Sequence, residues 1–391
     1  MTCSEQSENL SPFAYLIAIH PLGLLYGSAG PFLSPENLVG RAGASFPPSA
    51  ATLSGVFAAQ HGNGNVQNLQ LAGPFWANTQ TIEPQNKHEQ DFYVPTPMTY
   101  LVKKGESTIS NQLSWQQTET GYGWRDRDGK VPIGKYESNT WVSIKDWHNP
   151  TTVHGKSWEF VPHLHPRLEL DQRRVAPGRN ALAEGEVNQG SLFLENAVQL
   201  NTDCCLVYLA NEKLPAGWYR FGGEGHMVEI TCHKLQPHIR KDLLSPDSLG
   251  RAFATITPAV WGSNRLSERY PAAWRDLLTV GNPESSEIKE SILTAKPMPF
   301  RYRLGGPPDK PKRLSRGRYA VPAGAVYVLR ESLETLLPNS PSTPWHQWPD
   351  DWFPKEGPHM NRWGCGLALS LPSAIASSAG RKASSRESAI A

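Results

Sequence analysis

Several features are scarce in this sequence, and each scarcity excludes a class of protein. The 391 residues include five cysteines, and no two of them form a Cys-x-x-Cys pair. The adjacent Cys204 and Cys205 cannot bridge to each other in ordinary geometry, so we expect no disulfide framework and a reduced, cytoplasmic setting. Cys204, Cys205, Cys232 and His233 also lack the spacing of metal ligands, which leaves a metal site without support.

Neither sign of charge dominates the chain. Lys and Arg number 38 and Asp and Glu 36, for a formal net charge of +2. A uniformly basic surface is therefore excluded, and a protein of this composition that binds nucleic acid must gather its cations locally. No apolar run reaches transmembrane length, and the polar segment Met1–Asn9 lacks the basic and apolar regions of a signal peptide. We expect no membrane association.

What the sequence does contain is glycine and proline, 33 and 34 residues respectively. This composition favours β-rich structure with many turns, and the length suffices for two or three domains. One clear helix is predicted in Phe46–Gln60, where Pro48 and Ser49 suit a helix start and Leu53, Val56 and Phe57 share one face. Strands predicted from Tyr15 onward complete an antiparallel α+β fold.

The most distinctive stretch is Tyr219–Cys232, in which Gly222, Gly223 and Gly225 surround Glu224. Glycine lets the backbone turn tightly, and successive N–H groups in such a turn form a concavity that binds anions. Met227, Ile230 and Cys232 then predict a strand that ends in the core. A plain turn between two strands remains the commoner interpretation of such a loop.

A second glycine loop, Gly364–Gly366, also leads into an apolar strand, Leu367–Leu371. This weak internal repeat suggests two copies of one α+β unit. We expect a tail at residues 1–11, a first unit at 12–238 with an insertion at about 77–160, a second unit at 239–373, and a disordered tail at 374–391. Tyr93–Leu101 and Tyr319–Leu329 are each predicted as one strand.

Basic residues gather in two places. The cluster Lys310, Lys312, Arg313, Arg316 and Arg318 has one acid nearby in sequence, Asp309, and either tracks phosphates or is a solvated loop. Arg167, Arg173, Arg174 and Arg179 form the other cluster, which Glu169 and Asp171 partly neutralise. His163 and His165 either bond to RNA or cap a strand.

Five segments together resemble the RAMP superfamily of CRISPR-associated proteins, and most closely the third subunit of the Cmr (type III-B) effector complex. In chain order they are Ile19–Leu25, Phe46–Gly55, His165–Asp171 with Glu184–Phe193, Phe221–Gly225 and Ala320–Tyr327. The sequence departs from the family at Tyr26–Phe32, which lacks two arginines, and at His226, which replaces an arginine.

The resemblance implies tandem ferredoxin-like (RRM-like) domains and a non-catalytic, cofactor-free subunit in antiviral defence. It implies a grip on the 5′ handle of the crRNA and docking on the large, polymerase/cyclase-like Cmr subunit and a backbone RAMP subunit, with target RNA met through the complex. The candidate RNA-binding residues are Gly222, Gly223, Gly225, His226, His165, Arg167, Arg173, Arg174, Arg179, Ser49, Thr52, Lys310, Lys312, Arg313, Arg316 and Arg318.

Two alternatives stay open. A RAMP-type endoribonuclease that cuts CRISPR repeats shares the fold but needs a paired acid and base, and His20, His165 and His226 show no such pairing in the sequence. A carbohydrate-binding protein would explain Trp345, Trp348 and Trp352 beside Asp350 and Asp351 as an aromatic sugar platform, although adjacent carboxylates on an extended chain point in different directions.

Overall fold

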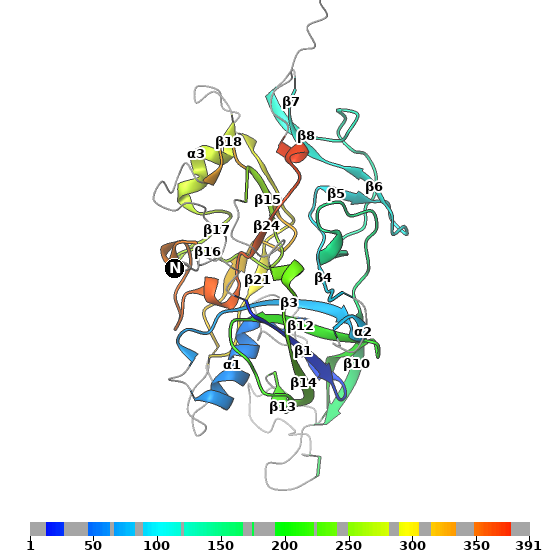
Figure 1. Ribbon diagram of the computed structural model, residues 1–391, viewed down its shortest axis with the longest axis vertical. Coiled ribbons are helices and arrows are strands. Elements are labelled where there is room, and N and C mark those ends of the chain that lie inside the picture. Colours follow the sequence, from blue (N-terminus) through cyan, green and yellow to red (C-terminus); the bar gives the residue numbers. More distant parts are fainter. Residues whose placement is uncertain are drawn as a thin grey trace, which may run out of the picture.

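The protein is described by a computed structural model in which β-strands predominate and helices are few (Figure 1). The described residues are 13–26, 46–62, 66–82, 89–118, 121–166, 174–175, 192–222, 225–240, 249–280, 289–304, 314–333 and 348–376. None of the helices in these ranges combines the length and apolar character that crossing a membrane requires.

The larger of the two main sheets holds seven antiparallel strands in the order β13-β14-β1-β12-β3-β4-β9. Their bounds are β1 Tyr15–Pro21, β3 Leu71–Asn78, β4 Tyr93–Pro95, β9 Trp141–Ser143, β12 Cys204–Ala210, β13 Gly217–Phe221 and β14 His226–Lys234. Both faces of the central strands are covered. In β1, Leu16 and Ala18 pack into one core cluster and Ile17 and Ile19 into another, which explains why the strand reads as a continuous apolar run.

Helix α1 (Ala50–His61) connects β1 to β3 and covers one face of this sheet. Leu53, Val56 and Phe57 are buried against the sheet, so the predicted apolar stripe is confirmed. The helix ends at Gly62, whose φ is 85°, and the Gly62 N–H bonds to the Ala58 carbonyl.

The second main sheet holds four antiparallel strands in the order β20-β23-β15-β24. Their bounds are β15 Ala252–Thr255, β20 Ile292–Leu293, β23 Val326–Val328 and β24 Ala368–Ser370. A short 3-10 turn (Ala272–Trp274) and α3 (Arg275–Leu278) lie between β15 and β20. Read from β24 to β20, the sheet therefore holds its fourth, first, third and second strands in chain order. Four strands of the larger sheet, read from β14 through β1 and β12 to β3, follow the same fourth-first-third-second order.

Residues 77–160 contribute to the larger sheet as well as extending beyond it. After α2 (Thr79–Ile82), strands β4 and β9 join the sheet, whereas two hairpins lie apart from it, at the upper right of Figure 1. The hairpins are β5 Tyr100–Val102 with β6 Ile109–Gln112, and β7 Ser114–Thr118 with β8 Gly121–Arg125. The prediction of one strand over Tyr93–Leu101 was wrong, because Pro95 and Pro97 lack the N–H groups that a continuous ladder needs.

The remaining elements are short pairs and turns. A three-stranded sheet has the order β10-β11-β2, with β2 Leu25–Tyr26, β10 Trp158–Pro166 and β11 Leu192–Leu200. Two-stranded pairs are β16 Trp261–Gly262 with β17 Ser267–Glu268, β18 Thr279–Val280 with β19 Lys289–Glu290, and β21 Met298–Phe300 with β22 Arg318–Ala320. The predicted strand Tyr319–Leu329 is therefore two strands, β22 and β23, separated by the turn at Pro322–Gly324.

The two main sheets share one core. A single cluster of buried residues includes Leu16, Phe75 and Val207 from the first sheet and Phe253 and Tyr327 from the second. The Trp147 indole N–H adds a hydrogen bond of 2.8 Å to the carbonyl of Ser370 on β24. The halves are consequently packed through a common interior rather than joined by a linker alone.

This packing bears on three sequence predictions and corrects two of them. The second glycine loop, Gly364–Gly366, is buried, and a Cβ added at Gly364 would lie 2.5 Å from the Ala72 Cα on β3. It is therefore a packing contact between the halves. Met227 is 42% exposed, whereas Val228 and Ile230 are buried, so Met227 points away from the core while Ile230 enters it as predicted. The predicted tail begins too early, because Ile375 and Ala376 are buried in a 3-10 turn at Ser373–Ala376.

Candidate nucleic-acid interface

A groove with a volume of about 2340 Å³ runs between the two halves of the molecule. The first half contributes Phe46–Thr52 at the start of α1, the turn at Gly222 and Gly225, and Asn139–Trp141. The second half contributes Ala295–Leu304 and Lys355–His359. Segments that lie far apart in the sequence therefore form a single concave surface.

This groove is basic although the chain as a whole is nearly neutral. Its lining includes seven Lys or Arg residues and three Asp or Glu residues: Lys156, Arg220, Lys296, Arg301, Arg303, Lys355 and Arg362 against Glu137, Asp350 and Glu356. Clefts that concentrate one sign of charge between low-dielectric walls raise the local concentration of ligands of the opposite sign. The arrangement suits a polyanion.

The glycine turn forms part of the groove wall. Gly222 and Gly225 have φ values of 80° and 67°, a left-handed conformation that glycine adopts without steric cost. The Gly225 N–H reaches the Gly222 carbonyl at 3.3 Å and closes the turn. Arg220 lies alongside, with its side chain 3.7 Å from where a Cβ on Gly225 would be. A backbone turn and a guanidinium thus face the groove together.

His226 follows the turn and stacks on Tyr26, with ring centroids 4.8 Å apart and planes inclined by 29°. Tyr26 lines the groove. A face-to-face stack is a packing contact, whereas a proton relay needs one ring atom to approach another in the plane of the ring. This histidine–tyrosine pair therefore does not have the geometry of an acid–base pair.

The N-terminus of α1 opens into the same groove through Ser49 and Thr52. Ser49 occupies the N-cap position in extended conformation, yet its hydroxyl makes no capping bond to the helix. The Thr52 N–H bonds to the Ser49 carbonyl at 2.8 Å. The N–H groups of a first helical turn have no partners within the helix, and together with the helix dipole they favour an anion nearby.

Aromatic rings form another part of the wall. Phe46 and Trp158 meet edge to face at 5.3 Å, and Trp158 meets Trp141 in the same manner at 5.8 Å. The Lys156 ammonium group lies 5.1 Å from the centre of the Phe160 ring. Trp141 and Trp158 are buried and support this wall, whereas Phe46 and Phe160 are partly exposed. The two exposed rings can present stacking surfaces to single-stranded bases, next to a cation for the phosphate.

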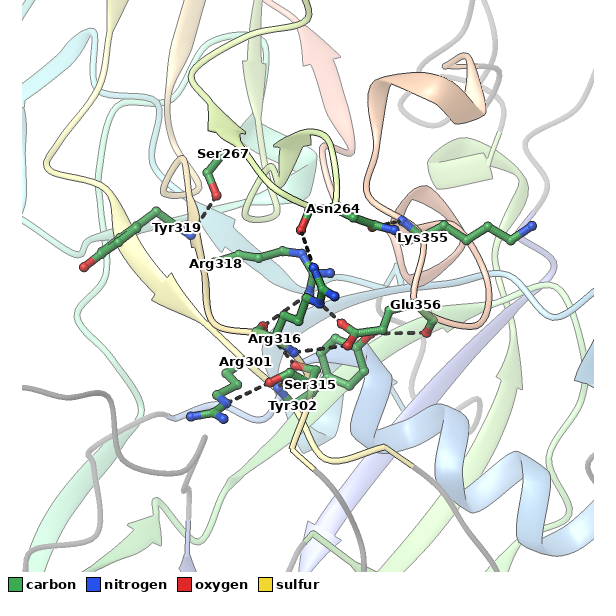
Figure 2. A network of polar contacts seen from close by, with 10 residues as sticks. All are labelled: Asn264, Ser267, Arg301, Tyr302, Ser315, Arg316, Arg318, Tyr319, Lys355 and Glu356. Carbon is green, nitrogen blue, oxygen red and sulfur yellow. Dashed lines mark hydrogen bonds and ion pairs between the residues drawn. The ribbon is translucent and has the colours of Figure 1, made fainter.

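Two arginines of the predicted basic cluster are held by a polar network at the groove (Figure 2). Arg318 Nη1 lies 2.7 Å from Glu356 Oε2, and its side chain is almost wholly buried. The other carboxylate oxygen of Glu356 accepts the Arg316 N–H at 3.1 Å. Asp309 is the one acid near this cluster in the sequence, but folding also brings Glu356 to it from a distant part of the chain. Arg318 is consequently a structural cation, whereas Arg316 is exposed.

The polar network around Glu356 also fixes Tyr302, which lies just beyond the end of β21 and lines the groove. Tyr302 donates its N–H to the Ser315 hydroxyl at 3.0 Å and its phenol O–H to the Glu356 carbonyl at 3.4 Å. Burial raises the pKa of the Tyr302 phenol above its ordinary value of 10.0, and the nearby Glu356 carboxylate acts in the same direction. The phenol therefore stays protonated at neutral pH and does not act as a base.

Several predicted residues fall outside this description. Arg174 is exposed in the short described segment 174–175. His165 lies on β10 opposite Phe193 of β11, and its side chain is outside the described residues. So are Gly223, Arg167, Arg173, Arg179, Lys310, Lys312 and Arg313, as well as Gly27 and Gly30 of the departing loop.

Of the three tryptophans of the proposed sugar platform, Trp348 is buried, Trp352 is half-buried and Trp345 lies outside the described residues. Trp348 is 2% exposed and donates its indole N–H to the Gly366 carbonyl at 3.0 Å. It packs among Trp261, Trp274 and Phe253 in the second half. An aromatic buried in this way offers no face to a sugar, so the carbohydrate-binding alternative loses the middle one of its three tryptophans.

Sequence reasoning missed all seven groove cations. Arg301 and Arg303 form only a pair in the sequence, and the other five are scattered singly along the chain: Lys156, Arg220, Lys296, Lys355 and Arg362. Arg220 stands two residues before the glycine turn, so its proximity to Gly222 was the one signal available. The other six gather only because the two sheets fold against each other.

A family model described as CRISPR-associated protein (Cas_Cmr3) matches residues 17–372. Similar solved structures include a chain of the type III-B Cmr-beta complex bound to cognate target RNA, with 11% identity, a TM-score of 0.41, and coverage of 81% of this chain and 86% of that chain. A chain of the Csm1-Csm4 cassette with AMPPNP has 11% identity, a TM-score of 0.30 and coverage of 81% and 87%. None of the curated proteins compared with the chain matches it.

Proposed function

The chain belongs to the Cas_Cmr3 family of CRISPR-associated proteins, and we propose that it is an RNA-binding, non-catalytic subunit of a type III-B (Cmr) RNA-guided interference complex. In this role it holds the 5′ handle of the crRNA in the groove between its two halves. It docks on the large Cmr subunit and on a backbone RAMP subunit, and it meets target RNA through the assembled complex in the cytoplasm.

The observation that carries the proposal is the charge of the groove. Seven cations and three anions line it in a chain whose total charge is +2. Neutralising RNA phosphates releases the counterions condensed on them, and this release supplies most of the sequence-independent affinity. The start of α1 adds backbone N–H groups, which bind phosphate without any side-chain charge.

We further propose that the two main sheets are ferredoxin-like units, at about 12–238 and from 239 to at least Ala376, with residues 77–160 inserted in the first. The shared spatial order of strands, fourth-first-third-second, supports this interpretation. A ferredoxin-like unit has a second helix between its third and fourth strands. In the first unit the segment between β12 and β14 instead contains strand β13, which pairs with β14. The groove would then be the junction of two similar units.

The experiment compares two triple variants with equal changes in charge. The groove variant is Lys156→Glu, Arg220→Glu and Arg303→Glu, and the control is Lys104→Glu, Lys213→Glu and Arg265→Glu, whose side chains are exposed outside the groove. Fluorescence anisotropy would measure the affinity of each protein for a single-stranded RNA that carries the repeat-derived handle, at several salt concentrations.

We expect the groove variant to bind at least about 100-fold more weakly, and the slope of log affinity against log salt to fall by roughly 0.7 for each phosphate that the variant no longer neutralises. The control should stay within about 3-fold of the wild type. Equal weakening in both variants would contradict a localised site. Cleavage of a repeat RNA by the wild type without added metal would instead favour the endoribonuclease alternative.

A further inference from the structure

Asn139 has an unusual backbone conformation at the wall of the groove. Its φ is 57°, and in the part of the chain that the structure describes it is the one residue other than glycine with a positive φ. A positive φ is uncommon outside glycine, and asparagine is among the few residues that tolerate it. Asn139 lines the groove and is exposed. The turn therefore places an accessible side-chain amide on the groove wall.

The turn around Asn139 is anchored on both sides. Before it, the Glu137 N–H donates to the Val102 carbonyl at 2.8 Å. After it, the Thr96 N–H donates to the Thr140 carbonyl at 3.0 Å, and the hydroxyls of these two threonines lie 3.0 Å apart. Backbone held in this way limits the positions that the Asn139 side chain can take. Such preorganisation lowers the entropy that a ligand must overcome on binding.

The protein itself makes no use of this amide. Within the described chain the Asn139 side chain has no hydrogen-bond partner. Glycine would adopt the same backbone angles at a lower steric cost, so the turn does not require an asparagine. Among the described residues that line the groove, only Gln67 provides another side-chain amide. The Asn139 amide is consequently available to a ligand in the groove.

An aromatic ring that can hold a base belongs to the same wall. Trp141, two residues beyond Asn139, contacts Trp158 edge to face at 5.8 Å, and Trp158 contacts Phe46 at 5.3 Å. The two tryptophans are buried, whereas Phe46 is partly exposed. An unpaired base that stacks on a ring keeps its edges free, and proteins read single-stranded RNA by hydrogen bonds to those edges.

The chemistry of the amide favours one base. An asparagine side chain presents an N–H donor beside a carbonyl acceptor. Adenine offers the complementary pair on both of its exposed edges, because its N6 amine lies next to N1 on one edge and next to N7 on the other. Guanine has two acceptors on the edge that carries N7, and the pyrimidines have such a pair on a single edge. Asparagine accordingly pairs with adenine in direct readout of nucleic acids.

We propose that Asn139 is a specificity-determining residue of the groove, whose amide pairs with an unpaired adenine of the bound RNA. The amide carbonyl accepts a hydrogen bond from the adenine N6 amine, and the amide N–H donates to N1 or N7. That the groove holds RNA rests on the proposed function, whereas the choice of base rests on Asn139. The groove cations supply affinity that is independent of sequence, and the uncharged amide adds selectivity.

The test compares two single-stranded RNA octamers, one of adenosine and one of purine riboside, a nucleoside with the same rings that lacks the N6 amine. Asn139→Gly removes the amide and keeps a residue suited to the left-handed backbone. Asn149→Gly, at an exposed asparagine outside the groove, is the matched control. Fluorescence anisotropy measures the affinity of the full-length wild type and of both variants for each octamer and for the handle RNA.

We expect the wild type and Asn149→Gly to bind the adenosine octamer about 10-fold more tightly than the purine riboside octamer. Asn139→Gly should bind the two octamers within about 2-fold of each other, and should bind the purine riboside octamer as the wild type does. The proposal would be overturned by a wild type that binds both octamers equally or neither of them. It would also be overturned if Asn139→Gly kept the preference for adenosine or weakened both octamers alike.

Binding of the handle RNA separates this proposal from the proposed function. A wild type that retains handle RNA in a salt-dependent manner but shows no preference for adenosine would leave the groove proposal standing and remove Asn139 from base recognition. A wild type that does not retain handle RNA would contradict the proposed function itself.

Discussion

At the scale of single residues, Gly364 shows how closely the two halves approach. A Cβ at this position would lie 2.5 Å from the Ala72 Cα and 2.6 Å from the Leu71 carbonyl oxygen, and its φ is +68°. Gly357 has a comparable φ of +91° but no atom within 4 Å of the same point. Substituting each of these two glycines therefore separates the cost of a left-handed backbone, which both share, from the cost of the close contact with β3, which only Gly364 makes.

We predict that Gly364→Ala lowers the free energy of unfolding by at least about 3 kcal/mol, because β3 cannot retreat without disturbing the larger sheet. Gly357→Ala should cost only the roughly 1–2 kcal/mol of a left-handed alanine. Urea denaturation measures both values. Equal costs for the two variants would mean that the contact with β3 is not tight.

Asp91 carries a pH-dependent contribution to stability. Burial is the main cause that raises the pKa of its carboxyl above 3.8, although the Ser143 hydroxyl, 2.8 Å and 2.9 Å from its two oxygens, opposes the shift. An acid with a raised pKa binds protons more tightly in the folded state. Its contribution to stability is therefore greatest below the unfolded pKa and is lost as pH rises through the folded pKa.

We predict that Asp91→Asn gains stability relative to the wild type as pH rises above 3.8, because the amide stays neutral where the carboxyl must ionise. Denaturation midpoints measured at a series of pH values above 3.8 would show the difference growing until the folded carboxyl is ionised. A difference that stays constant or shrinks with rising pH would contradict the raised pKa.

The residue scale also shows a limit of the sequence. The cluster at Arg316 and Arg318 was recognisable from spacing, but its counter-ion, Glu356, could not be found because tertiary pairing joins segments that are far apart. Gly222 and Gly225 were identified as a turn, and their left-handed conformation confirms that prediction. Contact of that turn with RNA stays a prediction.

At the scale of elements, helix α1 combines a structural and a binding role that can be separated by experiment. Its N-cap residue, Ser49, lines the groove and makes no capping bond. An aspartate there would cap the helix and oppose its dipole, stabilising it by up to about 1 kcal/mol. The same carboxylate would repel a phosphate in the groove.

We predict that Ser49→Asp leaves the thermal midpoint unchanged or raises it while weakening RNA binding about 3- to 10-fold. Ser49→Asn, which caps equally well without charge, is the matched control and should bind RNA as the wild type does. Thermal melts and anisotropy titrations give the two readouts. Normal RNA affinity in Ser49→Asp would remove the start of α1 from the interface.

Elements were predictable where one local pattern decided them. The stripe of Leu53, Val56 and Phe57 identified α1 because these residues have the helical spacing i, i+3, i+4 shortly after Pro48 and Ser49, which suit a helix start. The strand after the glycine turn was placed correctly, but Val228 rather than Met227 is buried. A short strand with apolar residues on both faces does not reveal which face meets the core, and here only packing against α1 decides it.

At the scale of the whole molecule, the shared core predicts cooperative behaviour. Buried residues of both sheets form one cluster, from Leu16 and Phe75 to Phe253 and Tyr327. We therefore predict a single unfolding transition in calorimetry, with a van't Hoff enthalpy close to the calorimetric enthalpy. Residues 12–238 expressed alone should expose apolar surface and bind a hydrophobic dye. Two resolved transitions would show that the halves are independent domains.

The groove itself lies beyond what sequence alone could predict. Its cations come singly from both halves, and only the packing of two sheets gathers them into one surface. Composition correctly required that any basic surface be local, because the net charge is +2. The family resemblance, now supported by a match over residues 17–372, supplied an expected ligand, and the structure supplied a place that suits it.

The most direct test of that place is photo-cross-linking of handle RNA carrying 4-thiouridine, followed by mass spectrometry of the cross-linked peptides. The account predicts cross-links on both walls of the groove, in peptides that contain the partly exposed Phe160 from the first half and the exposed Met298 from the second. Cross-links confined to one half alone, or an absence of cross-links in the groove, would contradict it.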